Sequence, residues 1–213
     1  MRTKALLVAA VLAAGLATSM AQNVYSLNVV GYYNVEMAAG WNLVANQLDQ
    51  PGDNTVATVF GDQLPNNAQV FKFVGGSWSQ SDAYLTGVGW LAGGTITVNP
   101  GEGVFVNCPE ATTVTFVGEV KQGELSIPYG AGYSVVSSQV PQAGGVESVL
   151  GYAPQAGDQL VFWSKGDQSF ATSAAYVSGL GWLPSEPSVG VGESFFVSSD
   201  AGGTWTRNFA VPE

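Results

Sequence analysis

Two glutamates at matching places are the residues of this sequence that could take part in hydrolysis. Glu102 lies in the segment PGEGVFV and Glu193 lies in VGESFFV. A pair of carboxylates is the usual device of glycoside hydrolases, with one acting as general acid and the other as base or nucleophile. The two residues occupy equivalent turns of separate repeats, so nothing in the sequence brings them to the required spacing of roughly 5–10 Å. We expect each glutamate to cap a turn before a strand and the protein not to be an enzyme, with a glycoside hydrolase as the remote alternative.

Other catalytic and metal-binding devices have little support in the composition. The 213 residues include no histidine and one cysteine, Cys108. This excludes Ser-His-Asp and Cys-His catalysis and the zinc sites that contain histidine. We expect Cys108 to be a small buried strand residue, with pairing between chains as the alternative. The loop DQPGDN (49–54) offers oxygen ligands of the kind that Ca²⁺ prefers but lacks the spacing of a dedicated loop. We therefore expect a solvated turn there, and neither a metal nor a cofactor.

Aromatic and amide side chains near loops are the residues that could bind a carbohydrate. Aromatic rings can pack against the apolar faces of sugars, and amide groups can bond sugar hydroxyls. The candidates are Trp78, Gln80, Tyr84, Trp163 and Tyr176. A carbohydrate-binding module is therefore one alternative for the function.

An internal repeat organises the chain. TGVGWL (86–91) returns as SGLGWL (178–183), and GWNLVANQL (40–48) returns as GYSVVSSQV (132–140), both at an offset of 92. Two copies of one domain explain the pattern, and we predict domains at 22–119 and 120–213. A single active site needs its residues only once, so positions kept in both copies are expected to serve folding. They are Gly40 and Gly132, Gly89 and Gly181, Trp90 and Trp182, Gly101 and Gly192, and Glu102 and Glu193.

Short β-branched and aromatic runs separated by turn residues predict an all-β fold. In LNVVGYYNVEM (27–37), apolar residues alternate with the period of a half-buried strand. Further strands are predicted at 41–48, 69–74, 95–98, 103–107 and 112–118, with counterparts in the second copy. The segments VATVFG (56–61) and VESVLG (146–151) each predict one short helical turn that ends on a glycine. The prediction is two tandem sandwich- or barrel-like β domains of similar sequence.

The junction between the copies is nearly without a linker. The closing strand of the first copy therefore runs directly into the opening strand of the second, which predicts a semi-rigid rod. Strand edges at the two terminal segments could also pair with another chain. Weak head-to-tail association of chains is thus a second expectation.

The first 21 residues have the features of a secretory signal peptide. Arg2 and Lys4 precede an apolar run at 5–17, and Ser19 and Ala21 fit the small-residue rule of a cleavage site. The apolar run is shorter than the roughly 20 residues that span a bilayer. We expect export to the periplasm, cell surface or medium, with no membrane insertion after cleavage.

The charge of the exported chain disfavours anionic partners. Two of the six basic residues and none of the sixteen acidic ones lie in 1–21, so four basic and sixteen acidic residues remain, a formal net charge of −12. Nucleic-acid binding depends on clustered Lys and Arg, which this chain lacks. We therefore expect no nucleic-acid partner.

Several of these segments also resemble a known family. QNVYSLNVVGYYNV, GWNLVANQL, PGEGVFV and TVTFVGEV are similar to segments of secreted all-β repeat proteins common in Verrucomicrobia-like bacteria. The resemblance covers the first repeat well and the second loosely, where Tyr133 stands in place of Trp and Ser194 in place of the second glycine. It implies secretion and a β domain, and it brings no catalytic residues. The resulting expectation is a secreted structural or interaction protein of the envelope or matrix, with a protein or polysaccharide of the cell surface as partner.

Overall fold

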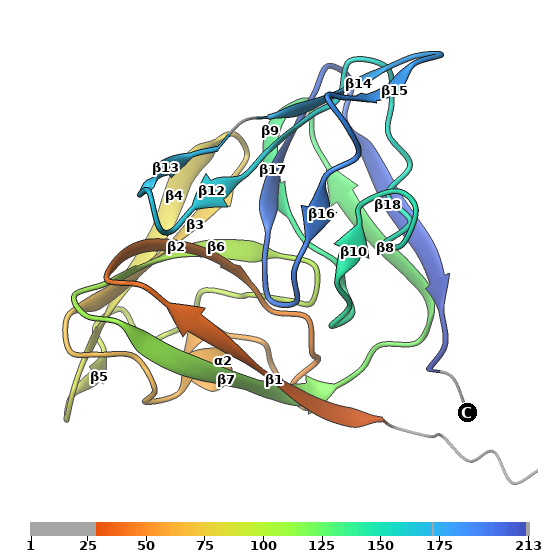
Figure 1. Cartoon of the computed structure of the whole chain (residues 1–213). Coiled ribbons are helices and arrows are strands. Elements are labelled where there is room, and N and C mark those ends of the chain that lie inside the picture. Colours follow the sequence, from red (N-terminus) through yellow and green to blue (C-terminus); the bar gives the residue numbers. More distant parts are fainter. Residues whose placement is uncertain (1–28, 172, 212–213) are drawn as a thin grey trace, which may run out of the picture.

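The computed structural model describes residues 29–171 and 173–211 (Figure 1). The predicted signal peptide and the terminal residues 22–28 lie outside this range. As predicted, the fold is all-β, and the described chain has a single short α-helix, α2 (Val56–Phe60). In the same ranges, no helix has the length and apolar character needed to cross a bilayer.

The first half is a five-stranded antiparallel sheet with one face covered by a two-stranded ribbon. Its order is β2 (Gly40–Ala45), β6 (Gly103–Cys108), β3 (Ala68–Val74), β4 (Ser77–Leu85) and β5 (Gly89–Trp90). The ribbon pairs β1 (Val30–Met37) with β7 (Thr112–Glu119). The predicted alternation in β1 is confirmed, since Tyr33 and Met37 point into the core while Tyr32 is exposed. Helix α2 closes the same core with Val56, Val59 and Phe60.

The second half repeats this strand order. Its sheet runs β15 (Gly181–Leu183), β14 (Ala174–Val177), β11 (Gln159–Val161), β17 (Phe195–Ser199) and β9 (Gly132–Val136), and β8 (Gly123–Tyr129) pairs with β18 (Gly203–Phe209). Two further pairs join β10 (Gly144–Gly145) to β16 (Ser188–Val189) and β12 (Trp163–Ser164) to β13 (Ser169–Phe170). Each strand of this sheet has a counterpart in the first sheet at the offset of the sequence repeat. The order β15-β14-β11-β17-β9 then corresponds to β5-β4-β3-β6-β2. Two tandem domains with a boundary at 119/120 stay a prediction.

Segment 146–151 forms turns and not a full α-helix, but the N–H groups of Val149 and Gly151 donate to the carbonyls of Gly145 and Glu147 at 3.0 and 3.2 Å, as in the predicted helical turn. The prediction of a strand at 95–98 is wrong. Segment 95–98 contributes only an isolated bridge, from Thr97 to Thr55. The sequence analysis also missed the largely polar strand β4, which pairs with β3 and whose few apolar residues gave no alternation signal.

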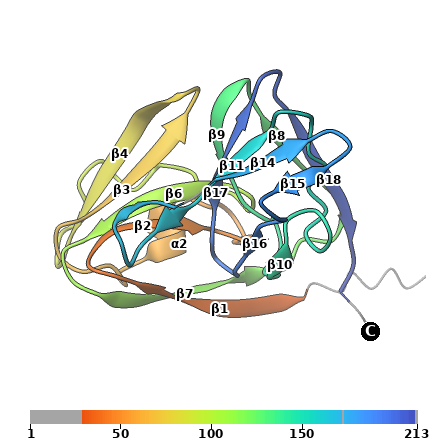
Figure 2. The ribbon, with the colours of Figure 1, turned by 45° about the horizontal axis from the view of Figure 1, so that its top comes forward.

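The two halves pack against each other, which corrects the expectation of a rod (Figure 2). The backbone N–H of Ala45 donates to the carbonyl of Gly192 at 2.8 Å, and the N–H of Ser137 donates to the carbonyl of Gly101 at 2.8 Å. Residues 45 and 137 correspond in the repeat, as do 101 and 192. The contact is therefore made twice, in the manner of an isologous two-fold interface. Isolated bridges repeat the same symmetry, from Val44 to Glu193 and from Glu102 to Val136.

Three apolar clusters result from this arrangement. Each half has its own core between the sheet and the ribbon. The third cluster lies where the outer faces of the two sheets meet, around Leu43, Phe105 and Phe196. It continues into a largely aromatic surface.

Candidate functional site

An aromatic cleft at the junction of the two halves is the candidate site. Six side chains line a hollow of about 400 Å³, and all six are aromatic. Four come from the first half and two from the second. They are Trp41, Phe71, Trp78, Phe105, Trp163 and Phe170. Phe105 is only 5% exposed, whereas Trp78 and Phe170 are 47% and 55% exposed at the rim.

A tight turn places Trp78 on the cleft. Gly75 and Gly76 both have positive φ and form the two-residue turn of the β3–β4 hairpin, so Val74 pairs with Ser77 and Phe73 with Trp78. Directly paired residues point to the same face of a sheet, and Phe73 belongs to the third cluster. The rings of Phe73 and Trp78 are accordingly 4.9 Å apart.

A β-bulge then separates Trp78 from the rest of its strand. The register shifts between Lys72 and Phe73, so that Gln80 pairs with Lys72 and Tyr84 pairs with Ala68. Without the shift, Trp78, Gln80 and Tyr84 would point to one face because they share parity. With it, Trp78 faces the cleft and Tyr84 is buried in the first core.

The β12–β13 hairpin supplies the opposite wall. Trp163 pairs with Phe170 at a ring distance of 5.1 Å, and these two positions correspond in the repeat to Phe73 and Trp78. The hairpin is tied to strand β2, over which it lies in Figure 1. Gln168 accepts a hydrogen bond from the N–H of Trp41 and donates one to its carbonyl, and the Trp163 indole N–H donates to the same carbonyl at 2.9 Å. The edge of β2 is thereby covered by side chains.

The five carbohydrate candidates do not form one site. The structure brings Trp78 and Trp163 together in the cleft, on either side of Phe105, at ring distances of 5.4 and 5.1 Å. Tyr84 packs in the first core, and Tyr176 packs against the second core beside Trp182. Gln80 lies on the opposite face from Trp78 because of the bulge. The carbohydrate hypothesis therefore retains two of its five residues.

Four lining residues were missed by the sequence analysis. Trp41, Phe71 and Phe105 stand on the runs GWNLVA, VFKF and GVFV, which have apolar residues on both parities, whereas Phe170 stands in the polar segment DQSFATS, which has no such pattern. A strand that is apolar on both faces is packed on both faces. Such runs indicate a second packed surface on the sheet. The candidates chosen for their position near loops did not include the residues on these runs.

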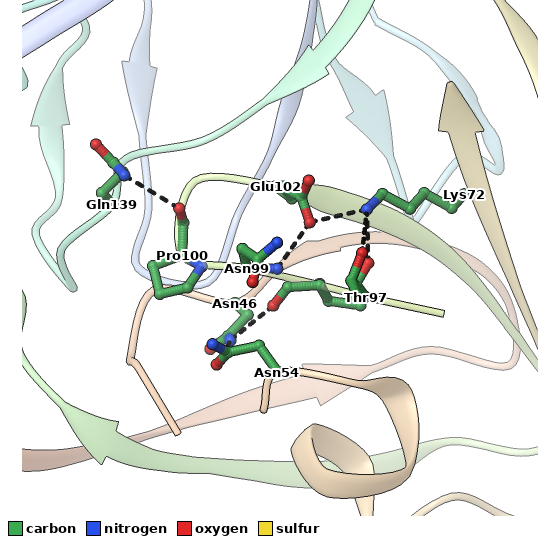
Figure 3. Close-up of polar contacts among 9 residues, drawn as sticks. Asn46, Asn54, Lys72, Thr97, Asn99, Pro100, Glu102 and Gln139 are labelled. Carbon is green, nitrogen blue, oxygen red and sulfur yellow. Dashed lines mark hydrogen bonds and ion pairs between the residues drawn. The ribbon is translucent and has the colours of Figure 1, made fainter. Parts of the chain in front are cut away.

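The two glutamates act as turn caps, as predicted. Glu102 Oε2 accepts from the N–H of Asn99 at 2.7 Å, and Glu193 Oε2 accepts from the N–H of Gly190 at 2.8 Å. Glu102 also forms an ion pair with the buried ammonium of Lys72 at 2.8 Å. Lys72 uses its remaining donors on the carbonyl and hydroxyl of Thr97 (Figure 3).

A larger hollow of about 510 Å³ adjoins this ion pair and is lined by Lys72, Glu102 and Tyr133 among others. Gln139 reaches across the junction there, donating to the carbonyl of Pro100 (Figure 3). The ammonium of Lys72 and the carboxylate of Glu102 satisfy each other and the surrounding backbone, so they are not poised toward a ligand. We therefore place the candidate site in the aromatic cleft.

The carboxylates of the loop at 49–54 are engaged with neighbouring side chains of the protein. Asp49 accepts from the Asn54 amide at 2.7 Å, and Asp53 accepts from the hydroxyls of Thr55 and Thr58 at the start of α2. Hydrogen bonds from Thr58 and Thr55 lower the pKa of Asp53. Among the described residues, no group of three His, Cys, Asp or Glu side chains could hold a metal ion.

The repeated positions serve the fold in the ways their residue types suggest. All six repeated glycines have positive φ. Trp90 packs against the first core and Trp182 is buried in the second. Cys108 is buried beside Met37, and burial raises the pKa of its thiol to about 11. The thiol is thus a packed strand residue, as predicted.

Comparisons with protein-family models, with curated proteins and with solved structures found no match to this chain.

Proposed function

We propose that this protein is a non-enzymatic binding protein of the cell exterior and that the aromatic cleft holds its ligand. The observation that carries this proposal is the gathering of six aromatic side chains from both halves around one open hollow. Exposed apolar surface on a soluble protein is costly and commonly marks a binding site. Export, expected from residues 1–21, would place the cleft outside the inner membrane.

The absence of enzymatic activity is part of the same proposal. Both glutamates that a hydrolase would use are engaged as caps, and Glu102 is also paired with Lys72. We expect no turnover of a polysaccharide panel by the protein. Hydrolysis that is lost in Glu102→Gln and retained in Glu110→Gln, an exposed control, would contradict this expectation.

A carbohydrate is the second candidate ligand. The exposed ring of Trp78 at the rim can stack on the apolar face of a sugar, as Trp rings do in many sugar sites. Yet the described lining offers no amide, hydroxyl or carboxylate side chain to bond a sugar hydroxyl. A sugar would then bind only through the exposed rings at the rim of the cleft.

The test uses the chain that begins at residue 22, with its intrinsic tryptophan fluorescence as the readout. The ligand panel consists of soluble polysaccharides, peptidoglycan fragments and small organic cations. A true ligand should give a saturable signal that Trp78→Ala and Phe170→Ala each weaken by about tenfold or more, because each removes a large contact area. Leu180→Ala is the matched control, since Leu180 is also an exposed apolar residue but lies away from the cleft. Saturable binding that neither cleft variant weakens would place the site elsewhere.

A further inference from the structure

The lining of the aromatic cleft restricts what it can bind. A ligand that buries a hydroxyl, amide or carboxylate in the hollow exchanges hydrogen bonds with water for contacts with carbon, which is unfavourable. The described lining has no side chain of those polar types to compensate. Of the three indole N–H groups in the lining, that of Trp163 is bound to the carbonyl of Trp41. An indole N–H only donates, so the lining side chains offer a ligand no hydrogen-bond acceptor. The group that enters should therefore have no N–H or O–H donor to satisfy.

The arrangement of the rings favours a positive charge on that group. Phe105, the least exposed of the rings with a stated exposure, makes interplanar angles of 88° with Trp41, 89° with Trp163 and 85° with Phe170, and a tilted angle of 59° with Trp78. The rings around the hollow are therefore inclined to Phe105 and not stacked on it. The face of an aromatic ring is its negative side, and cations within about 6 Å of a ring centroid are attracted to it. Tryptophan, which provides three of the six rings, is the strongest of these partners.

The charge of the chain points the same way. The formal net charge is −10 over all 213 residues, and no lining residue is cationic. The lysines on the elements that carry the lining, strand β3 and the β12–β13 hairpin, are engaged, because Lys72 is paired with Glu102 and Lys165 donates to the carbonyl of Glu36 at 2.6 Å. An external cation thus meets an attractive field and has no lysine of the protein to compete with.

We propose that the cleft is an aromatic cage for the quaternary ammonium group of a small cationic molecule of the choline kind. The inference rests on the proposed function, since it names the ligand of the same cleft. A trimethylammonium group forms no hydrogen bonds and carries a full positive charge, so it meets both restrictions. A hollow of about 400 Å³ is within the usual range for small-molecule sites. A zwitterion such as glycine betaine binds less well, because its carboxylate has no cationic partner in the described lining.

The experiment compares a cation with its neutral isostere on the full exported chain. Choline and tetramethylammonium are titrated by calorimetry and tryptophan fluorescence against 3,3-dimethylbutan-1-ol, which replaces nitrogen by carbon at nearly the same shape. We expect choline to bind at least about tenfold more tightly than the alcohol, and glycine betaine to fall between them or below. Sodium chloride at equal ionic strength controls for screening.

Two variants distinguish the contribution of an aromatic ring from that of apolar contact area alone. Trp78→Leu and Phe170→Leu replace exposed rim rings by aliphatic groups, so both variants should fold, as circular dichroism would verify. We expect them to lose about tenfold in affinity for choline and to keep most of their affinity for the neutral alcohol. Leu180→Ala should bind both as the parent does. Parallel losses for the two ligands would overturn the cage and leave an unselective apolar site.

The remaining outcomes distinguish this proposal from the one on which it rests. Equal affinity for choline and the alcohol, or Trp78-dependent binding of a glycan without binding of choline, overturns the cage and retains the binding cleft. Binding to phosphatidylcholine vesicles without binding to free choline also overturns it, because the ligand would then be a membrane surface. If no probe produces a signal that depends on Trp78 or Phe170, the cage and the proposed function both fail.

Discussion

Gly101 and Gly192 lie where each half receives a backbone hydrogen bond from the other. Both have positive φ, at 98° and 77°. A β-carbon at Gly101 would lie 2.6 Å from Ile127 Cδ1, and one at Gly192 would lie 2.5 Å from Val35 Cγ2. Val35 and Ile127 also correspond in the repeat. The glycines of PGEG and VGES are thus required by the junction as well as by their own turns.

We expect Gly101→Ala to lower the free energy of unfolding more than Gly89→Ala does. Gly89 has the same φ of 98°, but a β-carbon added there would meet no atom within 4 Å, so its variant suffers backbone strain alone. Strain of that kind costs about 1 kcal/mol or more, and overpacking at Gly101 adds about 1–3 kcal/mol. Urea unfolding monitored by fluorescence gives both values. Equal decreases in the free energy of unfolding for the two variants would show that the residues around Gly101 can shift to accommodate the added methyl group.

Glu186 gives a prediction on pH. Its Oε1 accepts from the N–H groups of Ser148 and Glu147 at 2.7 and 2.8 Å, and these bonds, foremost that of Ser148, lower the pKa of the carboxyl. A lowered folded-state pKa means that the carboxylate stabilises the fold fully above the unfolded pKa of about 4.3. That contribution is lost as the pH falls through the lower folded-state value.

Glu186→Gln should therefore lower the Tm at pH 7, and the difference from the parent should shrink as the pH falls through the acid range. Thermal melts at pH values from neutral down to about 3 measure it. Glu110→Gln, which removes one negative charge from an exposed position, is the control. A Tm difference for Glu186→Gln that stays constant over this whole range would disagree with this assignment.

At the scale of elements, the β12–β13 hairpin determines whether the cleft exists. Its main tether is Gln168, whose amide bonds both backbone groups of Trp41 and the carbonyl of Lys165. We expect Gln168→Ala to release the hairpin while leaving both cores intact. Hydrogen exchange of the Trp41 amide should then accelerate, and ligand affinity in the cleft should fall, with a loss of global stability of about 1 kcal/mol.

Asp167→Ala is the control for this tether, since the Asp167 carboxylate bonds the hydroxyl of Ser164 within the hairpin itself. Unchanged exchange at Trp41 in Gln168→Ala would mean that the aromatic contacts and the Trp163 indole bond to the same carbonyl hold the hairpin without Gln168.

Features that depend on a local sequence pattern could be predicted, whereas features that depend on how strands pair could not. The alternation of β1 and of β8 was visible because each has one buried face, and the repeated glycines were visible as turns with positive φ. The face of Trp78 was not visible, because it depends on a two-residue turn and on a bulge that reverses parity within one strand. Residue pairs such as Trp163 and Phe170 follow from the repeat only once Phe73 and Trp78 are known to pair.

At the scale of the molecule, the two copies share an architecture and differ at the junction. Lys72 in the first copy corresponds to Phe162 in the second, which packs against Phe195 in the second core. The hollow beside Lys72 is about 510 Å³, whereas the hollow beside Phe162 and Glu193 is about 230 Å³. The junction is therefore symmetric in its backbone contacts and asymmetric in its side chains. The two hollows at the junction therefore differ in both volume and lining.

The contacts between the halves also predict how the molecule unfolds. Leu43, Phe105 and Phe196 are only 5–8% exposed, in a cluster built from both halves. Each large apolar side chain contributes about 1.5–3 kcal/mol on burial. Three of them together are comparable with the total stability of a small domain, about 5–15 kcal/mol. Neither half should then keep its full stability alone.

We therefore expect the exported chain to unfold in a single transition, with calorimetric and van't Hoff enthalpies in agreement. A chain of residues 22–121 should melt at a lower temperature than the whole protein, because separation exposes Leu43 and Phe105 to water. Phe196→Ala, a change in the second half alone, should lower the protection of core amides in the first half as well, at Val70 and Val106 for example. Val177→Ala is its control, since Val177 is an exposed residue of the second half that lies outside the shared cluster. Two calorimetric transitions, with an isolated first half as stable as the whole, would instead establish independent domains that touch without mutual stabilisation.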